Sequence, residues 1–347
     1  MDYTHIREML SELCSLPGPS GFERPVALKA AELIRPYMDE VSVDRMGNLL
    51  GVRRCGIPGA KSILLDAHLD EIGLMVIGSE EGFLRFRTIG GVDPRMLPDR
   101  EVTILTDPPL FGVVACLPPH VLQAGEADKS VPIPDLFIDT GLTQEQVEQL
   151  IPAGTPCVFR DSCFSLGDHQ MCGKAMDDRA CFVTLVRAVE MLCDKKLDVD
   201  LYILGSTREE VSHGGAATAV YRVSPDCCVA VDVTHGKTPD TPAERTSVLG
   251  GGPAIGVGPN MTRWMTERMK AKAKERDISV QYEVMAGATG TNGWDMQIAR
   301  EGIATSVLSL PLKYMHSPVE TLDMNDIESV ASLLSAFVEG LGEEALA

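Results

Sequence analysis

The stretch that decides the fold runs from KAMDDRACFVTLVRAVEMLCD (174–194) through DLYILGS (200–206) and GGAATAVYR (214–222) to DCCVAVDV (226–233). Its first and third segments have the apolar spacing of helices, whereas the second and fourth are short apolar runs typical of buried strands. Strands that alternate with helices form a mainly parallel sheet with helices on both faces. The sequence therefore predicts an α/β fold with three layers, α/β/α.

The same alternation extends in both directions from this stretch. Helices are predicted in residues 6–13, 23–38, 262–276 and 325–341, and strands in residues 41–54, 62–70 and 304–311. Residues 72–165 differ, because short β-rich segments alternate there with glycine and proline turns, and helical spacing is confined to 144–150. We therefore predict one larger α/β domain, residues 1–71 and 166–347, interrupted by a small β-barrel-like domain at 72–165.

The composition excludes several classes of protein. The chain has 347 residues and a formal net charge of −19, so its surface repels nucleic acids and acidic lipids. No apolar run approaches the roughly 20 residues that cross a bilayer, and the first residues lack the pattern of a secretory signal. The ten cysteines form no CxxC pair and most lie in apolar runs, as expected of reduced thiols in a cytoplasmic protein. Motifs of zincins, α/β-hydrolases, P-loop NTPases and Rossmann dehydrogenases are absent.

Polar side chains cluster where the predicted strands end. They are His68 and Asp70, Asp177 and Asp178, Glu209 and Glu210, Asp232, and His316. In open α/β sheets the carboxyl ends of the strands form the ligand site, so we expect these residues to converge there. Buried carboxylates need cations or protons beside them, and the basic residues at these places are few, mainly Lys174, Arg179 and Arg208.

A pair of divalent metal ions is the counter-charge that we expect. Asp177, Glu210 and Asp232 supply three negative charges, and His68 and His316 bind as neutral imidazoles. With one metal-bound hydroxide, four negative charges then balance the four positive charges of two divalent ions. Imidazole and carboxylate ligands suit zinc, cobalt or manganese.

Two acidic residues remain outside this ligand set. Glu209 is left free as the general base, which takes the proton of the bridging water and later delivers it to the leaving amine. Asp70 points to the same side of its strand as His68, so it can accept a hydrogen bond from the non-liganding nitrogen and fix the tautomer. Each pair alone has a structural explanation, such as a helix N-cap for the two aspartates or a turn for the two glutamates. Their ordered combination at strand ends favours a catalytic site.

Five motifs carry a resemblance to a known family: DAHLDEIGLMV (66–76), GKAMDDRA (173–180), TREEVSHGGA (207–216), VDVTHGKTPD (231–240) and LKYMHSPVE (312–320). They resemble those of the tetrahedral aminopeptidases, co-catalytic metallopeptidases that are often labelled glutamyl aminopeptidase or endoglucanase. The resemblance runs in order over nearly the whole chain, from Ser20 to Glu320, and includes the inserted domain. It implies a zinc-peptidase-like catalytic domain, with the insertion serving dimerisation or assembly.

The resemblance also implies individual roles. Asp177 would bridge the two metal ions of each subunit, His68 and Asp232 would complete one site, and Glu210 and His316 the other. Glu209 would be the general base, Asp70 the support of His68, and the Asp177–Asp178 peptide bond would be cis. Such enzymes remove amino acids from short peptides with a free N-terminus and commonly assemble as homododecamers of dimers.

One segment departs from the family pattern. In GATGTNGWDMQIAREG (287–302), Asn292 stands where aspartate is usual, and its neutral amide would weaken a contact with a substrate amine. Asn292 is therefore a candidate substrate-binding residue, and a helix cap is the alternative. The preferred N-terminal residue and the physiological metal are left open.

Three other functions fit parts of the pattern. A metal-dependent deacylase or amidohydrolase would use the same centre, because fold and ligands do not separate the two reactions. A carbohydrate-acting protein is disfavoured by the His and Asp ligand order and by an aromatic content of 5%. A non-catalytic assembly protein would require the loss of a ligand, and none of the five is missing.

Overall fold

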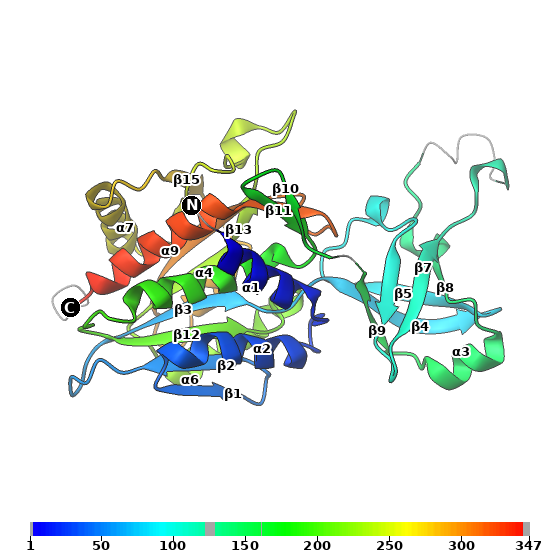
Figure 1. Ribbon diagram of the computed structural model, residues 1–347, viewed down its shortest axis with the longest axis horizontal. Helices are drawn as coiled ribbons and strands as arrows, with labels where there is room; N and C mark the ends of the chain where they lie inside the picture. Colours follow the sequence, from blue (N-terminus) through cyan, green and yellow to red (C-terminus); the bar gives the residue numbers. More distant parts are fainter. Residues whose placement is uncertain (1–2, 122–128, 161, 343–347) are drawn as a thin grey trace.

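The computed structural model describes residues 3–121, 129–160 and 162–342, which form a large sheet covered by helices and a closed barrel at one end of the molecule (Figure 1). The strands of the large sheet are β1 (Glu40–Val43), β2 (Leu49–Arg53), β3 (Ser62–His68), β10 (Phe164–Leu166), β11 (Gln170–Gly173), β12 (Asp200–Ser206), β13 (Cys227–His235), β14 (Ala254–Val257), β15 (Gln281–Val284), β16 (Ala304–Lys313) and β17 (Glu320–Asp323). The helices are α1 (Thr4–Ser15), α2 (Arg24–Ile34), α3 (Gln144–Leu150), α4 (Met176–Leu192), α5 (Glu209–Ser212), α6 (Gly214–Val223), α7 (Arg263–Glu275), α8 (Gly293–Met296) and α9 (Met324–Glu339).

The centre of the sheet is parallel, and the outer strands of the main path pair in antiparallel fashion, whereas β14 and β15, which lie off that path, pair with each other in parallel. The strand order is β1-β2-β12-β3-β13-β16-β17-β11-β10, and the four strands from β12 to β16 pair in parallel. β1 pairs with β2, and β10 with β11, in antiparallel fashion because their connections are too short for a crossover. The mainly parallel sheet predicted from the sequence therefore describes the four central strands.

Successive residues of a central strand enter different cores. Ile63 and Leu65 of β3 pack into the core shared with α1, α2, α4, α7 and α9, whereas Leu64 packs with residues of α6 and α8. This alternation follows from the two-residue period of a strand. Helices therefore cover both faces of the sheet, which confirms the predicted three layers; α1, α4 and α9 are seen crossing one face in Figure 1.

The barrel has a core of its own. Its strands are β4 (Gly73–Glu80), β5 (Phe83–Ile89), β6 (Glu101–Ile104), β7 (Leu110–Ala115), β8 (Phe137–Asp139) and β9 (Pro156–Phe159), closed in the order β4-β5-β8-β7-β6-β9. Buried Leu84, Val102 and Ile138 lie in this core. All six strands fall between residues 72 and 165, where the sequence predicts an insertion, and the assembly role of this domain stays a prediction.

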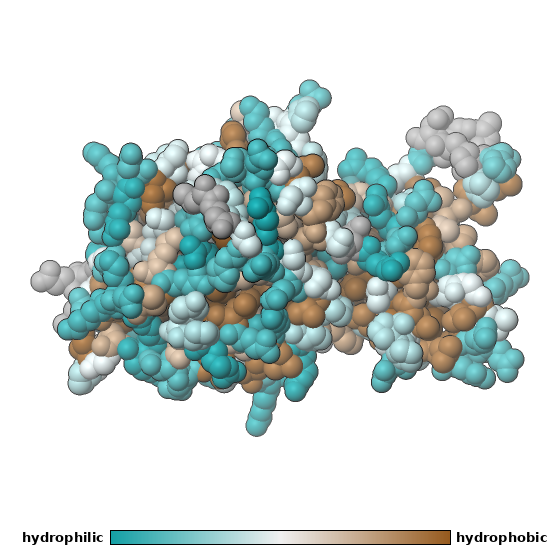
Figure 2. Space-filling model, in the orientation of Figure 1, coloured by the Kyte–Doolittle hydropathy of each residue, from teal (hydrophilic) through white to brown (hydrophobic). Residues whose placement is uncertain are grey.

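The surface carries both hydrophilic and hydrophobic residues (Figure 2). Hydrophilic residues predominate on the face shown in Figure 2, and hydrophobic residues appear in smaller groups, some of them on the barrel. None of the helices in the described ranges is long and apolar enough to cross a membrane. All ten cysteines are free thiols. The cytoplasmic location expected from the sequence stays a prediction.

Candidate metal and active site

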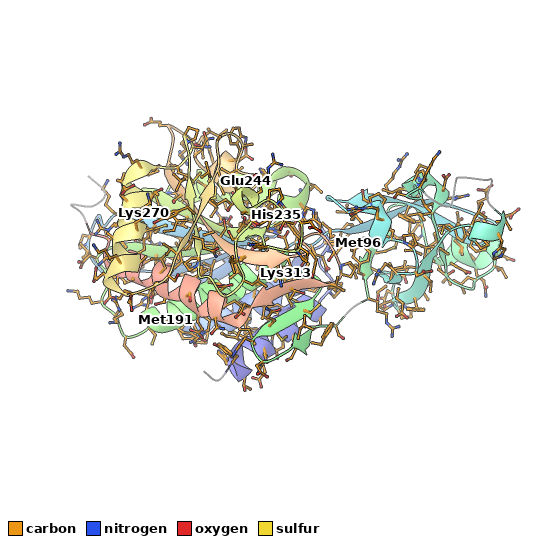
Figure 3. The ribbon with its side chains drawn as sticks, turned by 90° about the horizontal axis from the view of Figure 1, so that it is seen from above. Met96, Met191, His235, Glu244, Lys270 and Lys313 are labelled. Carbon is orange, nitrogen blue, oxygen red and sulfur yellow. The ribbon has the colours of Figure 1, made fainter. Side chains whose placement is uncertain are left out.

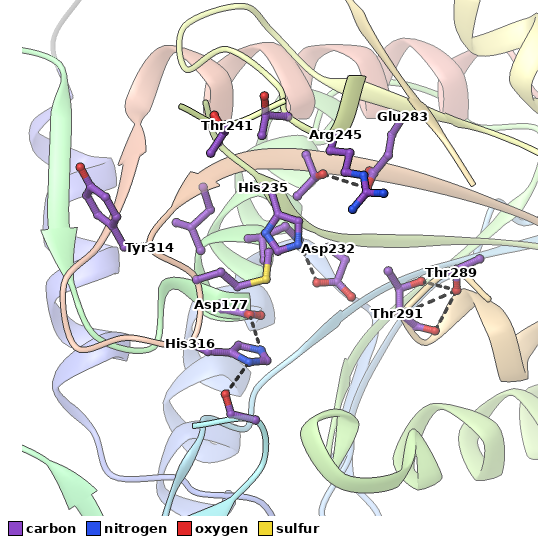
Figure 4. Close-up of a pocket in the computed structure, with 18 of the residues that line it drawn as sticks. Asp177, Asp232, His235, Thr241, Arg245, Glu283, Thr289, Thr291, Tyr314 and His316 are labelled. Carbon is purple, nitrogen blue, oxygen red and sulfur yellow. Dashed lines mark hydrogen bonds and ion pairs between the residues drawn. The ribbon is translucent and has the colours of Figure 1, made fainter. Parts of the chain in front are cut away.

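The carboxyl ends of the central strands open into one pocket of about 860 Å³. Asp177, Glu209, Glu210, Asp232 and His316 line it, and Figure 4 shows Asp177 and His316 side by side on its wall. Each of these residues follows or ends a structural element, because β12 leads into α5, β13 ends there, and the loop after β16 carries His316. The residues predicted to converge from distant parts of the sequence therefore do so.

Asp177 lies between the two histidines. Its Oδ1 is 3.0 Å from Nε2 of His68, and its Oδ2 is 3.4 Å from Nε2 of His316. The same nitrogen of His316 is 3.4 Å from Oε2 of Glu210. Burial raises the pKa of Asp177, but the two imidazoles outweigh it and hold that pKa below its usual range. The Asp177–Asp178 peptide bond is cis, as the resemblance implies.

Asp232 joins the cluster on the side of His68. One ligand atom from each of His68, Asp178 and Asp232 lies within 4.8 Å of the others. Asp178 accepts a hydrogen bond from the backbone N–H of His68 through Oδ2, while its buried Oδ1 has no hydrogen-bond partner in the described chain. Burial, and then repulsion from neighbouring carboxylates, raises the pKa values of Asp178 and Asp232.

The nearby basic residues do not neutralise this cluster. Lys174 Nζ lies 2.7 Å from Oε2 of Glu71, and Arg179 Nη2 lies 3.0 Å from Oε1 of the same carboxylate. All three side chains are at most 5% exposed. Because Glu71 pairs with both cations, neither of them compensates the carboxylates of the pocket, and divalent metal ions would balance that charge. The mixture of imidazole nitrogens and carboxylate oxygens fits zinc, cobalt or manganese.

Asp70 makes more contacts at the site than the contact with His68 that the sequence predicts. Nδ1 of His68, the ring nitrogen that faces away from Asp177, lies 3.2 Å from the backbone carbonyl oxygen of Asp70 and 3.3 Å from its carboxylate Oδ1. The same carboxylate accepts hydrogen bonds from the backbone N–H groups of Glu209 (3.0 Å) and Glu210 (3.2 Å) and from the hydroxyl of Ser20 (2.6 Å). Asp70 therefore fixes both the imidazole of His68 and the first turn of α5.

Glu320 is a site residue for which the sequence indicates no role. Its buried carboxylate accepts hydrogen bonds from the backbone N–H groups of Met176 (2.8 Å), Asp177 (3.1 Å) and His316 (2.9 Å). Burial, and then repulsion from Asp177, raises the pKa of Glu320. Glu320 ends the LKYMHSPVE motif, so its place in that motif was the only sign of a function.

Two glycines of the insertion also contact the site. The carbonyl of Gly91 lies 2.9 Å from Nδ1 of His316, and a Cβ at Gly91 would come within 2.8 Å of that nitrogen. Gly90 has φ +75°, and a Cβ there would lie 3.2 Å from Oε2 of Glu210. Only glycine fits both positions. The segment continues to Met96, which lies at the end of the barrel nearest the α/β domain (Figure 3).

Asn292 is buried next to Thr291, which lines the pocket. Its side chain is 1% exposed and donates hydrogen bonds to Oδ2 of Asp66 (2.8 Å) and to the hydroxyl of Ser206 (2.9 Å). It stands at the N-cap position of α8 but makes no capping hydrogen bond. Burial raises the pKa of Asp66 to about 7, so a neutral residue beside it avoids a second buried carboxylate. The substrate contact predicted for Asn292 stays a prediction, and its neighbour Thr291 lines the pocket.

The far wall of the pocket is polar and carries both signs of charge. Arg245 and Glu283 lie on it with several threonines, and His235 projects from the end of β13 (Figure 4). Glu283 accepts hydrogen bonds from the hydroxyls of Thr234 (2.8 Å) and Ser309 (2.7 Å). Arg245 and Glu283 lie outside the five quoted motifs, so no sequence pattern indicated them, whereas Thr234 and His235 belong to VDVTHGKTPD (231–240).

Known proteins resemble this chain in sequence and in overall fold. A model of the M42 glutamyl aminopeptidase family matches residues 47–333. The lysyl aminopeptidase of Pyrococcus furiosus is 32% identical over 340 residues, 96% of this chain and 97% of that protein. The aminopeptidase APDkam598 of the archaeon Desulfurococcus kamchatkensis has a TM-score of 0.92 at 35% identity, covering 99% of this chain and 98% of that one. The TET1 peptidase of Pyrococcus horikoshii, described as assembling into a tetrahedron or a large octahedral shell, has a TM-score of 0.85 at 31% identity, covering 96% and 99%.

These matches extend over almost the full length of both partners and include the inserted barrel as well as the α/β domain. They confirm the resemblance seen in the five motifs and identify a peptidase instead of a carbohydrate-acting protein. The chain belongs to the M42 family of glutamyl aminopeptidases, which are hydrolases of peptide bonds.

Proposed function

We propose that this chain is a two-metal aminopeptidase that releases N-terminal residues from short peptides. The observation that carries the proposal is Asp177, whose two carboxylate oxygens face different imidazoles at 3.0 and 3.4 Å. This arrangement supports a bridging role for Asp177, with His68 and Asp232 holding one ion and Glu210 and His316 the other. When bound, such a pair of ions polarises the scissile carbonyl and lowers the pKa of water.

Glu209 is the general base of the proposal. Its side chain is 10% exposed, lines the pocket, and places Oε2 3.8 Å from Nε2 of His68. The carboxylate takes a proton from the attacking water and delivers it to the leaving amine. Asp70 keeps Glu209 in place, because it accepts a hydrogen bond from the Glu209 backbone N–H.

The test is a panel of aminoacyl-p-nitroanilides and short peptides, each with a free and with an acetylated amino end. Charged and neutral N-terminal residues belong in the panel because Arg245 and Glu283 both line the pocket. We expect turnover of the free amines only, its loss after chelation, its return with zinc, cobalt or manganese, and about two ions per chain by elemental analysis. Absence of turnover by the metal-loaded protein would contradict the proposal, and preference for acetylated substrates would indicate a deacylase.

We also propose that the chain forms a homo-oligomer, either a dimer or a dodecamer, in which the barrel takes part in the contacts. The support is the similarity to the Pyrococcus horikoshii peptidase, whose described shells are closed assemblies. Light scattering should give about 450 kDa for twelve chains of 37.4 kDa, or about 75 kDa for two. A mass of one chain at micromolar concentration would refute both states.

A further inference from the structure

His213 occupies a strained position beside the site. It lies between α5 and α6 with φ +52°, in the left-handed region that glycine adopts most easily. The next two residues are Gly214 and Gly215, so glycine is frequent in this turn, yet a histidine stands at the strained position. A side chain kept at such a conformational cost needs a reason in its contacts.

The imidazole of His213 joins two carboxylates. Its Nε2 lies 3.3 Å from Oε1 of Glu209, the oxygen of that residue that does not face His68. Its Nδ1 lies 2.7 Å from Oδ2 of Asp295 in α8. The hydrogen bond that His213 donates to Glu209, and then the one that it donates to Asp295, outweighs burial and raises the pKa of His213 to about 8. Near neutral pH both ring nitrogens therefore carry hydrogens to donate.

We infer that His213, held by Asp295, is a positioning residue that orients the carboxylate of Glu209 for catalysis. The inference rests on the proposed role of Glu209 as general base. With Oε1 held by His213, the carboxylate keeps one rotamer, and Oε2 stays on the side of His68 and Asp177. A base must lie within hydrogen-bond reach of the proton that it takes, so its orientation affects kcat more than substrate binding.

The competing explanation is that His213 only links α5 to α8 and has no role in catalysis. Two variants with amide side chains distinguish this explanation from positioning of Glu209. In His213→Gln the side-chain amide reaches the place of Nε2 and can still donate to Glu209. In His213→Asn the shorter amide reaches the place of Nδ1 and can donate only to Asp295. Positioning of Glu209 therefore predicts rescue by glutamine, whereas a structural tie predicts rescue by asparagine.

The experiment measures kcat, KM, metal content and melting temperature for wild type, His213→Leu, His213→Gln, His213→Asn, Asp295→Asn and the double variant His213→Leu/Asp295→Asn. We expect His213→Leu and His213→Asn to lower kcat by about 10- to 100-fold with little change in KM or metal content. His213→Gln should retain most of the activity. Asp295→Asn should lower kcat less than His213→Leu and add nothing in the double variant, because it acts through the histidine. Glu301→Gln, in the same segment but exposed, is the matched control.

The inference is overturned if His213→Leu keeps kcat within about twofold of wild type, if asparagine rescues better than glutamine, or if the two single effects add in the double variant. These outcomes differ from a failure of the proposed function itself. If Glu209→Gln remains active, the base is misassigned and the role of His213 falls with it. If Glu209→Gln is inactive while His213→Leu is fully active, only the role of His213 is refuted.

Discussion

Replacement of Glu209 by glutamine is expected to lower kcat by about 10²- to 10⁴-fold. Glutamine has the size of glutamate but cannot take a proton from water, so the substitution removes the base and leaves the volume of the pocket unchanged. The five ligands assigned to the ions do not include Glu209, and the metal content should therefore stay at the wild-type value. Steady-state kinetics with the best substrate of the panel, together with elemental analysis, measures both quantities.

The comparison needs a variant that loses a carboxylate elsewhere. Glu301→Gln serves again, because Glu301 is exposed and does not line the site pocket. A Glu209→Gln protein that works within tenfold of wild type would show that another group takes the proton. Loss of metal from Glu209→Gln would show instead that Glu209 is a ligand, consistent with its position within 4.8 Å of His68 and Glu210.

Replacement of Glu71 by glutamine is expected to lower the free energy of unfolding by about 3–5 kcal/mol. The Glu71 carboxylate accepts from Lys174, Arg179 and the backbone N–H of Gly18, all within 3.0 Å. Without its charge, the two buried cations remain unpaired in a region that water does not reach. Urea unfolding of the metal-supplemented protein measures the change.

An exposed ion pair provides the control for Glu71. Glu101 lies 3.1 Å from Arg160 on the barrel, with both side chains more than half exposed. Glu101→Gln should change the free energy of unfolding by only about 0–1 kcal/mol, since water screens such pairs. Equal effects of the two substitutions would mean that burial does not increase the contribution of the Glu71 cluster to the free energy of unfolding. Our account of the charge balance at the site would then be wrong.

The part of the site that sequence could predict follows one rule. His68, Asp177, Glu209 and Asp232 each stand where an apolar run ends or turns, and parallel strands bring their carboxyl ends together. The layers of the α/β domain were predictable for a second reason, because the period of apolar residues distinguishes helices from buried strands. It was therefore predictable, without knowledge of any contact, that site residues as far apart in the sequence as His68 and His316 lie close together in space.

The contacts of the supporting groups with the backbone and with one another could not be predicted in this way. Glu320 and Asp70 act on backbone N–H groups, which every residue has, so no pattern of side chains reveals their partners. Glu71 lies next to Asp70 in the sequence, yet its partners Lys174 and Arg179 lie about a hundred positions away. Asn292 donates a hydrogen bond to Asp66, which belongs to a distant strand. Such pairings depend on tertiary contacts alone.

The hydrogen bond between the Gly91 carbonyl and Nδ1 of His316 has a practical consequence for protein engineering. The insertion cannot be removed without affecting the site, because its Gly91 carbonyl accepts from Nδ1 of His316 and so leaves Nε2 of that ring facing Asp177. A truncated version in which a short linker replaces the barrel would leave that ring free to rotate. Any chimaera that replaces the barrel with another domain must place a glycine carbonyl oxygen at the position of the Gly91 carbonyl.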